Sequence, residues 1–225
     1  MEDGVEFRRD ERGLALVGAG MELRVDFAEL LPRVRQDRLG HELLVRAARV
    51  KGVEHPVVWD ATAGLGEDSF LLAAAGFEVE LYERDARVAA LLRDGLERAA
   101  AEPELAEIVC RMHLHEGDSI AALEQLAAGV GSSATAGIVR PDVVYLDPMF
   151  PARSKSAAVK KKAQLMQMLE APCTDEEACA LVRAARAARP RKVVVKRPLK
   201  GPHLAGVKPA YSLEGRSVRF DVIVS

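Results

Sequence analysis

A turn of four residues, Asp147-Pro148-Met149-Phe150, has the groups best suited to chemistry. An exocyclic amine on a nucleic-acid base is a poor nucleophile, because its lone pair is delocalised into the ring. The Asp147 carboxylate and the Pro148 carbonyl can accept the two protons of such an amine and hold its nitrogen in line with an electrophile. Phe150 can stack on the base. The turn therefore predicts a site at which an amino group reacts.

A glycine-containing loop precedes this turn in the chain, at residues 60–66, with the sequence DATAGLG. Gly64 and Gly66 would let the backbone pass close to a bound cofactor, beside the start of a helix. An ordinary strand-to-helix turn is the alternative interpretation. A dinucleotide site favours a third glycine, in the pattern G-x-G-x-x-G, to cradle a pyrophosphate. S-adenosylmethionine has no phosphate, so this loop fits it better, and we include Asp60 among the candidate cofactor residues.

Two further strand ends carry polar residues. Glu83 follows the alternating stretch 78–82, where a carboxylate can accept both hydroxyl protons of a ribose. Asp85 is expected to cap the helix that follows. Asp118 and Ser119 end the next strand and can bind the amino edge of an adenine, although capping of the following helix is an equal possibility.

Basic residues are concentrated in two segments, although the formal net charge of the chain is −2. Residues 151–162 and 191–208 contain Lys and Arg but no Asp or Glu. We expect both segments at the cofactor edge of the sheet, where they can hold RNA phosphates, although solvated surface faces are the alternative. The candidate RNA-binding residues are Arg153, Lys155, Lys160, Lys161, Lys196 and Arg197.

The pattern of apolar runs predicts the strands and helices that position these residues. From Pro56 onward, short apolar runs alternate with helical stretches, which predicts an α/β fold with a parallel sheet. Strands are expected at residues 57–59, 78–82, 112–115, 143–146, 193–195 and 218–224, and helices at 67–75, 86–101 (ended by a proline at 103), 119–128, near 155–170 and at 174–188. Before Pro56 we expect a hairpin, 14–17 with 22–25, and a helix at 36–50. The predicted organisation is therefore an amino-terminal extension, 1–55, and a larger domain, 56–225.

Composition restricts the class of protein further. The three cysteines are odd in number and have no CxxC spacing, so we expect no disulfides. His113 and His115, two apart on a strand, are more typical of packing or surface residues than of a metal site. No apolar run is long enough for a membrane span, and residues 1–11 are mostly charged. These features favour a cytoplasmic protein without a membrane partner.

Together these motifs resemble one family, the small-subunit ribosomal RNA guanine-N2 methyltransferases of the RsmJ type. The matching stretches are residues 60–70 (DATAGLGEDSF), 83–84, 144–151 (VYLDPMFP), 155–161 (KSAAVKK), 193–198 (VVVKRP) and 219–221. The resemblance implies a Rossmann-like class I methyltransferase fold, with a mostly parallel seven-stranded sheet and helices on both faces. It also implies S-adenosylmethionine as cofactor and ribosomal RNA or the small ribosomal subunit as partner. The cofactor contacts that it implies are Glu67, Asp68, Glu83, Arg84, Asp118, Ser119 and Asp147.

The predicted function is methyl transfer from S-adenosylmethionine to the N2 amine of a guanine in small-subunit ribosomal RNA. The nearest alternative is an N-methyltransferase that acts on DNA adenine or cytosine, or on another RNA, because the chemistry of the turn at Asp147 would be shared. A dinucleotide-dependent oxidoreductase would leave that turn and the lysine-rich segment unexplained. A noncatalytic nucleic-acid-binding module would not need Gly64, Gly66 and Glu83 at one sheet edge.

Overall fold

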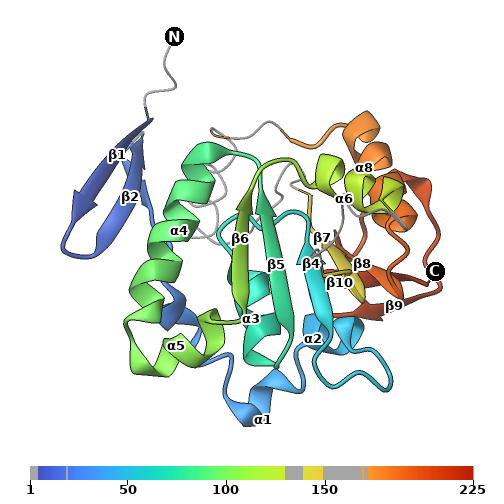
Figure 1. Ribbon diagram of the computed structural model, residues 1–225, viewed down its shortest axis with the longest axis horizontal. Helices are drawn as coiled ribbons and strands as arrows, with labels where there is room; N and C mark the ends of the chain where they lie inside the picture. The colour runs from blue at the N-terminus through green and yellow to red at the C-terminus, as the bar shows by residue number, and fades with distance from the viewer. Residues whose placement is uncertain (1–4, 19, 130–138, 149–168, 170–171, 225) are drawn as a thin grey trace.

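A seven-stranded sheet forms the centre of the molecule, in the order β6-β5-β4-β7-β8-β10-β9 (Figure 1). The computed structural model describes residues 5–18, 20–129, 139–148, 169 and 172–224. The strands of this sheet are β4 (Val57–Asp60), β5 (Glu78–Glu83), β6 (Met112–Glu116), β7 (Val143–Leu146), β8 (Lys192–Pro198), β9 (Tyr211–Glu214) and β10 (Val218–Val224). Strands β4 to β8 are parallel, and β10 is antiparallel to both β8 and β9. The expected seven-stranded, mostly parallel, Rossmann-like sheet is confirmed.

Strand β4 lies at the point where the chain changes direction across the sheet. The chain runs outward from β4 through β5 to β6, and then returns to place β7 on the other side of β4. The loops after β4 and β7 therefore diverge, and such a switch point leaves a crevice at the carboxyl ends of the strands. The predicted site residues at the ends of these strands are thus brought to one edge.

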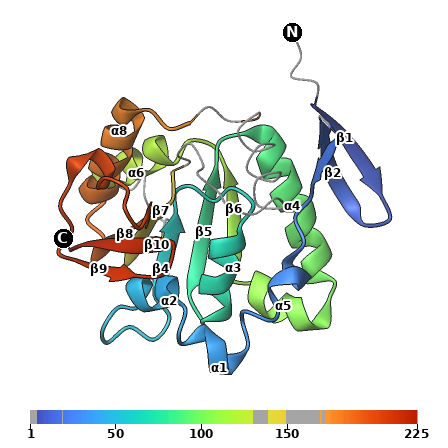
Figure 2. The ribbon, with the colours of Figure 1, turned by 180° about the vertical axis from the view of Figure 1, so that it is seen from behind.

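Helices cover both faces of the sheet, as predicted (Figures 1 and 2). One hydrophobic cluster joins the first face to α2, α3, α4 and α5, and a second joins the other face to α6 and α8. The bounds are α2 (Leu43–Ala48), α3 (Glu67–Ala74), α4 (Ala86–Ala100), α5 (Pro103–Val109), α6 (Ser119–Ala128) and α8 (Asp175–Ala187). No described helix has the length and apolar character that a membrane span needs.

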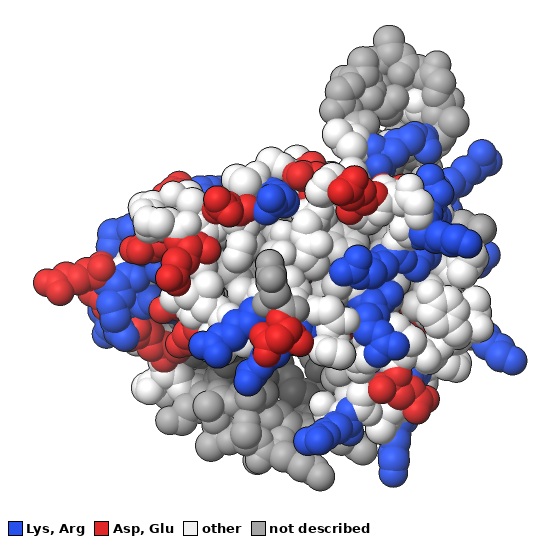
Figure 3. Space-filling view, turned by 90° about the horizontal axis from the view of Figure 1, so that it is seen from below, with Lys and Arg blue, Asp and Glu red and all other residues white. Residues whose placement is uncertain are grey.

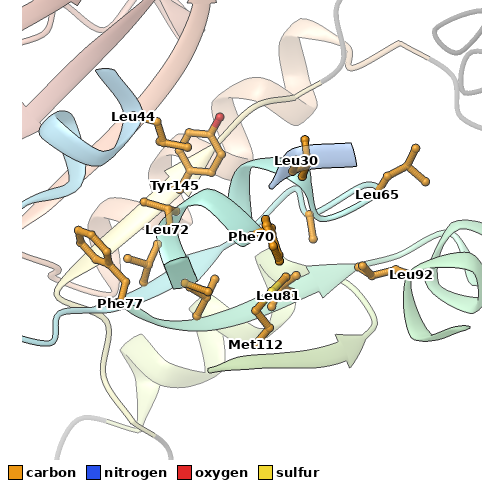
Figure 4. Close-up of a cluster of buried hydrophobic side chains, with 14 of the residues drawn as sticks. Leu30, Leu44, Leu65, Phe70, Leu72, Phe77, Leu81, Leu92, Met112 and Tyr145 are labelled. Atoms are coloured by element: carbon orange, nitrogen blue, oxygen red, sulfur yellow. The ribbon is translucent and has the colours of Figure 1, made fainter. Parts of the chain in front are cut away.

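Successive residues of the central strands point to opposite faces of the sheet, and this alternation explains why there are two hydrophobic clusters. In β4, Val58 belongs to the first cluster and Trp59 to the second; in β7, Tyr145 and Leu146 divide in the same way. Because both faces are buried, β7 has no polar alternation, which is the pattern that the sequence shows. Figure 4 shows Phe70 of α3 packed against the first face.

The amino-terminal segment forms a small antiparallel sheet of β1 (Val5–Asp10), β2 (Gly13–Gly18) and β3 (Met21–Leu23), which projects from one end of the molecule (Figure 1). The predicted hairpin corresponds to β2 and β3. Strand β1 was not predicted, because five of its six residues are exposed and its sequence has no apolar alternation. The buried Asp94 of α4 holds this sheet by accepting hydrogen bonds from the Arg9 side chain and the Leu14 backbone N–H.

Three other local expectations were incomplete or wrong. The predicted single helix at 36–50 is two short helices, α1 (Gln36–Leu39) and α2, because the chain turns at Gly40 and Glu42 is extended. Pro103 does not merely follow the end of α4; it occupies the first turn of α5, where its missing N–H costs nothing. Strand β9 was not predicted. The helix expected near 155–170 lies outside the described residues, apart from Leu169.

The predicted boundary between residues 55 and 56 stays a prediction. Buried side chains from the first 55 residues belong to the same hydrophobic cluster as the main sheet. The Phe27 ring, in the 3-10 helix η1 (Phe27–Leu30), stacks on Phe70 of α3 with ring centroids 5.0 Å apart. The segment therefore contributes to the core beneath the site.

Replacing Gly66 with alanine should destabilise the fold more than the same change at Gly64. Both have positive φ, +75° and +54°, so each substitution should cost about 1–2 kcal/mol of backbone strain. A Cβ at Gly66 would also lie 2.7 Å from Cδ1 of the buried Leu92, which adds about 1–3 kcal/mol, whereas nothing lies within 4 Å of a Cβ at Gly64. Urea unfolding of both variants measures the difference, and equal losses would contradict this packing argument.

Candidate functional site

A pocket opens at the carboxyl ends of β4, β5, β6 and β7, the edge predicted for the site. Its lining residues are Ala61, Thr62, Gly64, Tyr82, Glu83, Arg84, Gly117, Asp118, Ser119, Ile120, Asp147, Pro148, Cys173, Glu177 and Leu181. Seven of the predicted site residues are in this set: Gly64, Glu83, Arg84, Asp118, Ser119, Asp147 and Pro148. The crevice at the switch point is therefore polar along the strand ends and apolar where Tyr82, Ile120 and Leu181 contribute.

Glu83 connects two loops at the pocket wall. Its carboxylate accepts hydrogen bonds from the backbone N–H of Gly64 at 2.9 Å and of Asp85 at 2.8 Å. The residue is only 5% exposed, so its carboxylate is fixed in place. An added Cβ at Gly64 would meet no atom within 4 Å, which leaves the backbone there open to a ligand. A carboxylate beside an open glycine backbone is suited to binding the hydroxyl groups of a sugar.

Asp118 and Ser119 lie at the end of β6, across the pocket. The Asp118 carboxylate accepts the Ile120 N–H at 2.9 Å and caps α6, so the capping interpretation is confirmed. Both residues also line the pocket, and adenine recognition by them stays a prediction. Asp85 caps α4, as expected, through the N–H groups of Arg87 and Val88.

Helix α8 contributes to the pocket, which was not predicted from the sequence. Glu177 lines it and forms an ion pair with Arg84, at 3.2 Å. Glu177 is the third helical residue after Thr174, and the two form a capping box. The T-x-x-E spacing in the sequence was the available signal for a helix start at this point, although it does not indicate which cleft the helix faces. Cys173 lines the pocket too, and no sequence pattern pointed to it.

Asp147 is held at the pocket by both its backbone and its side chain. Its backbone N–H donates to Thr62 Oγ1 at 2.7 Å, and its carboxylate lies 2.9 Å from the Lys196 ammonium. Its side chain remains 37% exposed. Burial raises the pKa of Asp147, and the attraction of Lys196 opposes that shift. Thr62 was also missed, although it stands in the glycine loop already singled out.

Several predicted residues lie outside the pocket lining or outside the described part of the chain. Gly66 packs against α4, and Glu67 and Asp68 occupy the first turn of α3; none of the three is among the residues that line the pocket. Asp60 is 1% exposed and is not among the lining residues; it accepts hydrogen bonds from Ser69 Oγ and the Thr62 N–H. The undescribed candidates are Phe150, Arg153, Lys155, Lys160 and Lys161.

The basic residues of the segment 191–208 do not all lie at the cofactor edge. Arg191 and Lys192 stand at the start of β8, so the expectation that the whole segment lies beside the pocket was wrong for them. Figure 3 views the side opposite the pocket, where many Lys and Arg side chains gather. At the other end of β8, Lys196 is paired with carboxylates, and Arg197 is 3% exposed and donates to the Pro202 carbonyl.

Comparison with known proteins identifies the family and supports the fold. The model of a family described as putative SAM-dependent methyltransferase, where SAM is S-adenosylmethionine, matches residues 8–225. Ribosomal RNA small subunit methyltransferase J of Neisseria meningitidis is 44% identical over 213 residues, which are 95% of this chain and 80% of that protein. The chain belongs to this methyltransferase family. The methyltransferase J of Thioalkalivibrio sulfidiphilus is also 44% identical, over 90% of this chain and 76% of its own.

A solved structure of a SAM-dependent methyltransferase from Neisseria gonorrhoeae supports the same assignment. It has a TM-score of 0.76 and 36% identity, and the match covers 100% of this chain and 84% of that one. As a member of the methyltransferase J family, this protein is an enzyme that uses SAM. The pocket residues fit such a cofactor, because a sugar-binding carboxylate, an open glycine backbone and apolar side chains line the same crevice.

The variant Asp60→Asn should gain stability over the wild type as the pH rises. Burial, with the Asp68 and Asp147 carboxylates nearby, raises the pKa of Asp60 to about 7 from 3.8. The folded protein therefore keeps this proton in the pH window from about 4 to 7, where the unfolded chain releases it, and the Asp60 contribution to the free energy of unfolding falls across that window. Above pH 7 the difference between variant and wild type should reach up to about 4 kcal/mol.

Urea unfolding at several pH values from 4 to 8 measures this difference. The variant Asp37→Asn, at an exposed position of α1, is the matched control. A stability difference for Asp60→Asn that does not change with pH would show that the buried carboxyl does not titrate in this window.

Proposed function

We propose that the enzyme transfers the methyl group of SAM to the N2 amine of a guanine in small-subunit ribosomal RNA. The observation that carries the proposal is that Asp147 and Pro148, which can accept the protons of an amine, share one pocket with Glu83 and Asp118. The named relatives are small-subunit ribosomal RNA methyltransferases, and the motifs of this chain resemble enzymes specific for guanine N2.

In this proposal, residues at the ends of different strands bind different parts of the cofactor. Glu83 binds the ribose hydroxyls, and Asp118 and Ser119 bind the adenine edge. Gly64 and Arg84 border the remaining part of the pocket. When bound, SAM supplies a methyl group activated by the positive charge on its sulfur. The protein provides the orientation of that group and excludes water from it.

The amine is then held at the end of β7. Asp147 and the carbonyl of Pro148 accept hydrogen bonds from its two N–H groups and keep the nitrogen in line with the methyl group. Formation of the N–C bond would break the bond between the methyl carbon and sulfur, and one of the two N–H protons would leave the nitrogen. Phe150 is proposed to stack on the guanine. The N2 amine of a paired guanine lies in the minor groove, close to the backbone, so the base must leave its helix or come from an irregular region. Stacking on an aromatic ring offsets part of that cost, by about 1–3 kcal/mol.

Phosphate contacts are proposed for the first basic segment, at Arg153, Lys155, Lys160 and Lys161. Lys196 and Arg197 are less available to RNA, because carboxylates flank the first and the second is buried. Transfer to an amine of DNA or of a different RNA uses the same acceptor pair at Asp147, and identification of the methylated nucleoside separates these outcomes.

The variant Glu83→Ala should bind SAM about 10- to 150-fold more weakly, because it loses a charge-assisted acceptor worth about 1.5–3 kcal/mol. The loss of its bonds to the Gly64 and Asp85 backbones acts in the same direction. Titration calorimetry with SAM measures the affinity. Glu78→Ala, half-exposed on the same strand, is the matched control and should bind normally. Unchanged affinity for Glu83→Ala would remove Glu83 from the cofactor site.

The variant Asp147→Asn should lower kcat by about 10²- to 10³-fold, the range for losing a preorganised electrostatic partner. It keeps the shape of the turn but replaces a charged acceptor with a neutral amide that has a donor face. The substrate is ribosomal RNA, and separately small subunits, from cells that lack the enzyme. Mass spectrometry of the digested nucleosides identifies the product as N2-methylguanosine. Methylation at carbon, at a ribose oxygen or at a ring nitrogen, or full activity of Asp147→Asn, would contradict the proposal.

A further inference from the structure

Three elements meet at a cluster of charges that includes Asp147 of the pocket lining. The ammonium of Lys196, on β8, lies 2.6 Å from Asp68 Oδ2 in the first turn of α3 and 2.9 Å from Asp147 Oδ2 after β7. The hydroxyl of Tyr145, which is 1% exposed, donates to Asp68 Oδ2 at 2.6 Å. One ammonium therefore joins two carboxylates, and a buried phenol fixes one of them.

The members of this cluster differ in their access to the pocket. Asp147 lines it, whereas Asp68, Tyr145 and Lys196 are not among its lining residues. The Lys196 side chain is 27% exposed and that of Asp68 is 19% exposed. Lys196 therefore acts on the pocket through the Asp147 carboxylate.

We propose that Lys196 is a positioning residue for methyl transfer, which orients the Asp147 carboxylate and keeps it ionised, while Asp68 and Tyr145 hold the ammonium in place. The role rests on the proposed function, because it takes Asp147 as the group that binds the amine. The contact of the Asp147 N–H with Thr62 fixes the backbone, and the ion pair with Lys196 fixes the side chain. Two contacts from different parts of the fold thus hold Asp147, one at its backbone and one at its carboxylate, as precise alignment requires.

Charges around Asp147 explain why a cation is needed there. Among the described residues, the charged or titratable groups that influence it include Asp60 from β4, Asp68 from α3, Tyr145 from β7, and Lys196 and Arg197 from β8. Burial and the Asp68 carboxylate both raise the pKa of Asp147, while Lys196 and, more weakly, Arg197 lower it. Burial alone would lower the pKa of Lys196, but Asp147 and Asp68 raise it overall, so the ammonium keeps its proton. Without Lys196, Asp147 would hold a proton to higher pH and lose acceptor strength.

A phosphate contact is the competing role for Lys196. Two carboxylate oxygens within 3 Å of its ammonium already neutralise the charge that would attract a phosphate, and they would repel the phosphate itself. The two roles predict different kinetics. A positioning residue changes kcat and its pH dependence, whereas a phosphate ligand changes the KM for RNA and the salt dependence of binding.

The test compares Lys196→Met, which removes the charge, with Lys196→Arg, which keeps it. The control is Lys200→Met, at an exposed position just after β8. We expect Lys196→Met to lower kcat at pH 7 by at least about 10-fold and to move the acid limb of the kcat profile to higher pH, with KM for RNA within about 3-fold. Lys196→Arg should keep the limb near its wild-type position.

Carboxyl carbon NMR of Asp147 gives a readout that needs no RNA. Its titration midpoint should move to higher pH in Lys196→Met and stay unchanged in Lys200→Met. If Lys196→Met does not fold, the double variant Lys196→Met with Asp68→Asn is used, because it leaves fewer buried carboxylates without a counter-ion. Its Asp147 midpoint is compared with that of Asp68→Asn alone, since the loss of Asp68 by itself lowers the pKa of Asp147. An unmoved midpoint would overturn the positioning role, as would an unchanged kcat profile with a raised KM and a salt slope flattened by about 0.7–0.9. Failure of the proposed function would appear in the wild type, as a product other than N2-methylguanosine.

Discussion

Parallel strands end at a common edge, and the order β5-β4-β7 makes the loops at that edge separate. The crevice and every polar group in it depend on this constraint. Glu83, Asp118 and Asp147 are far apart in the chain, and each is simply the residue at, or just after, the end of its strand. The two hydrophobic clusters fix the sheet from both faces and so fix the positions of these ends. The packing of the core therefore determines the geometry of the site in this protein.

The site is rich in negative charge for a region so close to the core. Asp60, Asp68 and Asp147 influence one another, and one lysine lies between two of them. Such a surplus is costly in an interior, because each carboxylate loses hydration. It is suited to a cofactor with a positive sulfur. The raised pKa of Asp60 and the ammonium of Lys196 both reduce the net negative charge there.

Much of this arrangement was predictable because it depends on local patterns. The strands β4 to β8, the glycine loop, the cap at Asp85 and the Asp147 turn each leave a signal within a few residues. The ion pairs of Lys196 do not, since its partners come from α3 and from the residue after β7, and nothing in the sequence KRP separates an interior lysine from one that faces RNA. The pairing of Glu177 with Arg84 was hidden for the same reason, because 93 positions separate the two residues. Exposed β1 lacked the apolar alternation by which strands are recognised.

Glu83 has a consequence beyond its own contacts. Its two hydrogen bonds to the Gly64 and Asp85 backbones join the loops after β4 and β5 in the protein alone. The entropy of ordering this wall is therefore lost during folding, and an arriving nucleoside meets a rigid surface. The selectivity of this wall for ligands therefore depends on the order that folding gives it. Substitutions that reduce packing in the core beneath β5 should lower this selectivity at a smaller loss of stability than the one that unfolds the enzyme.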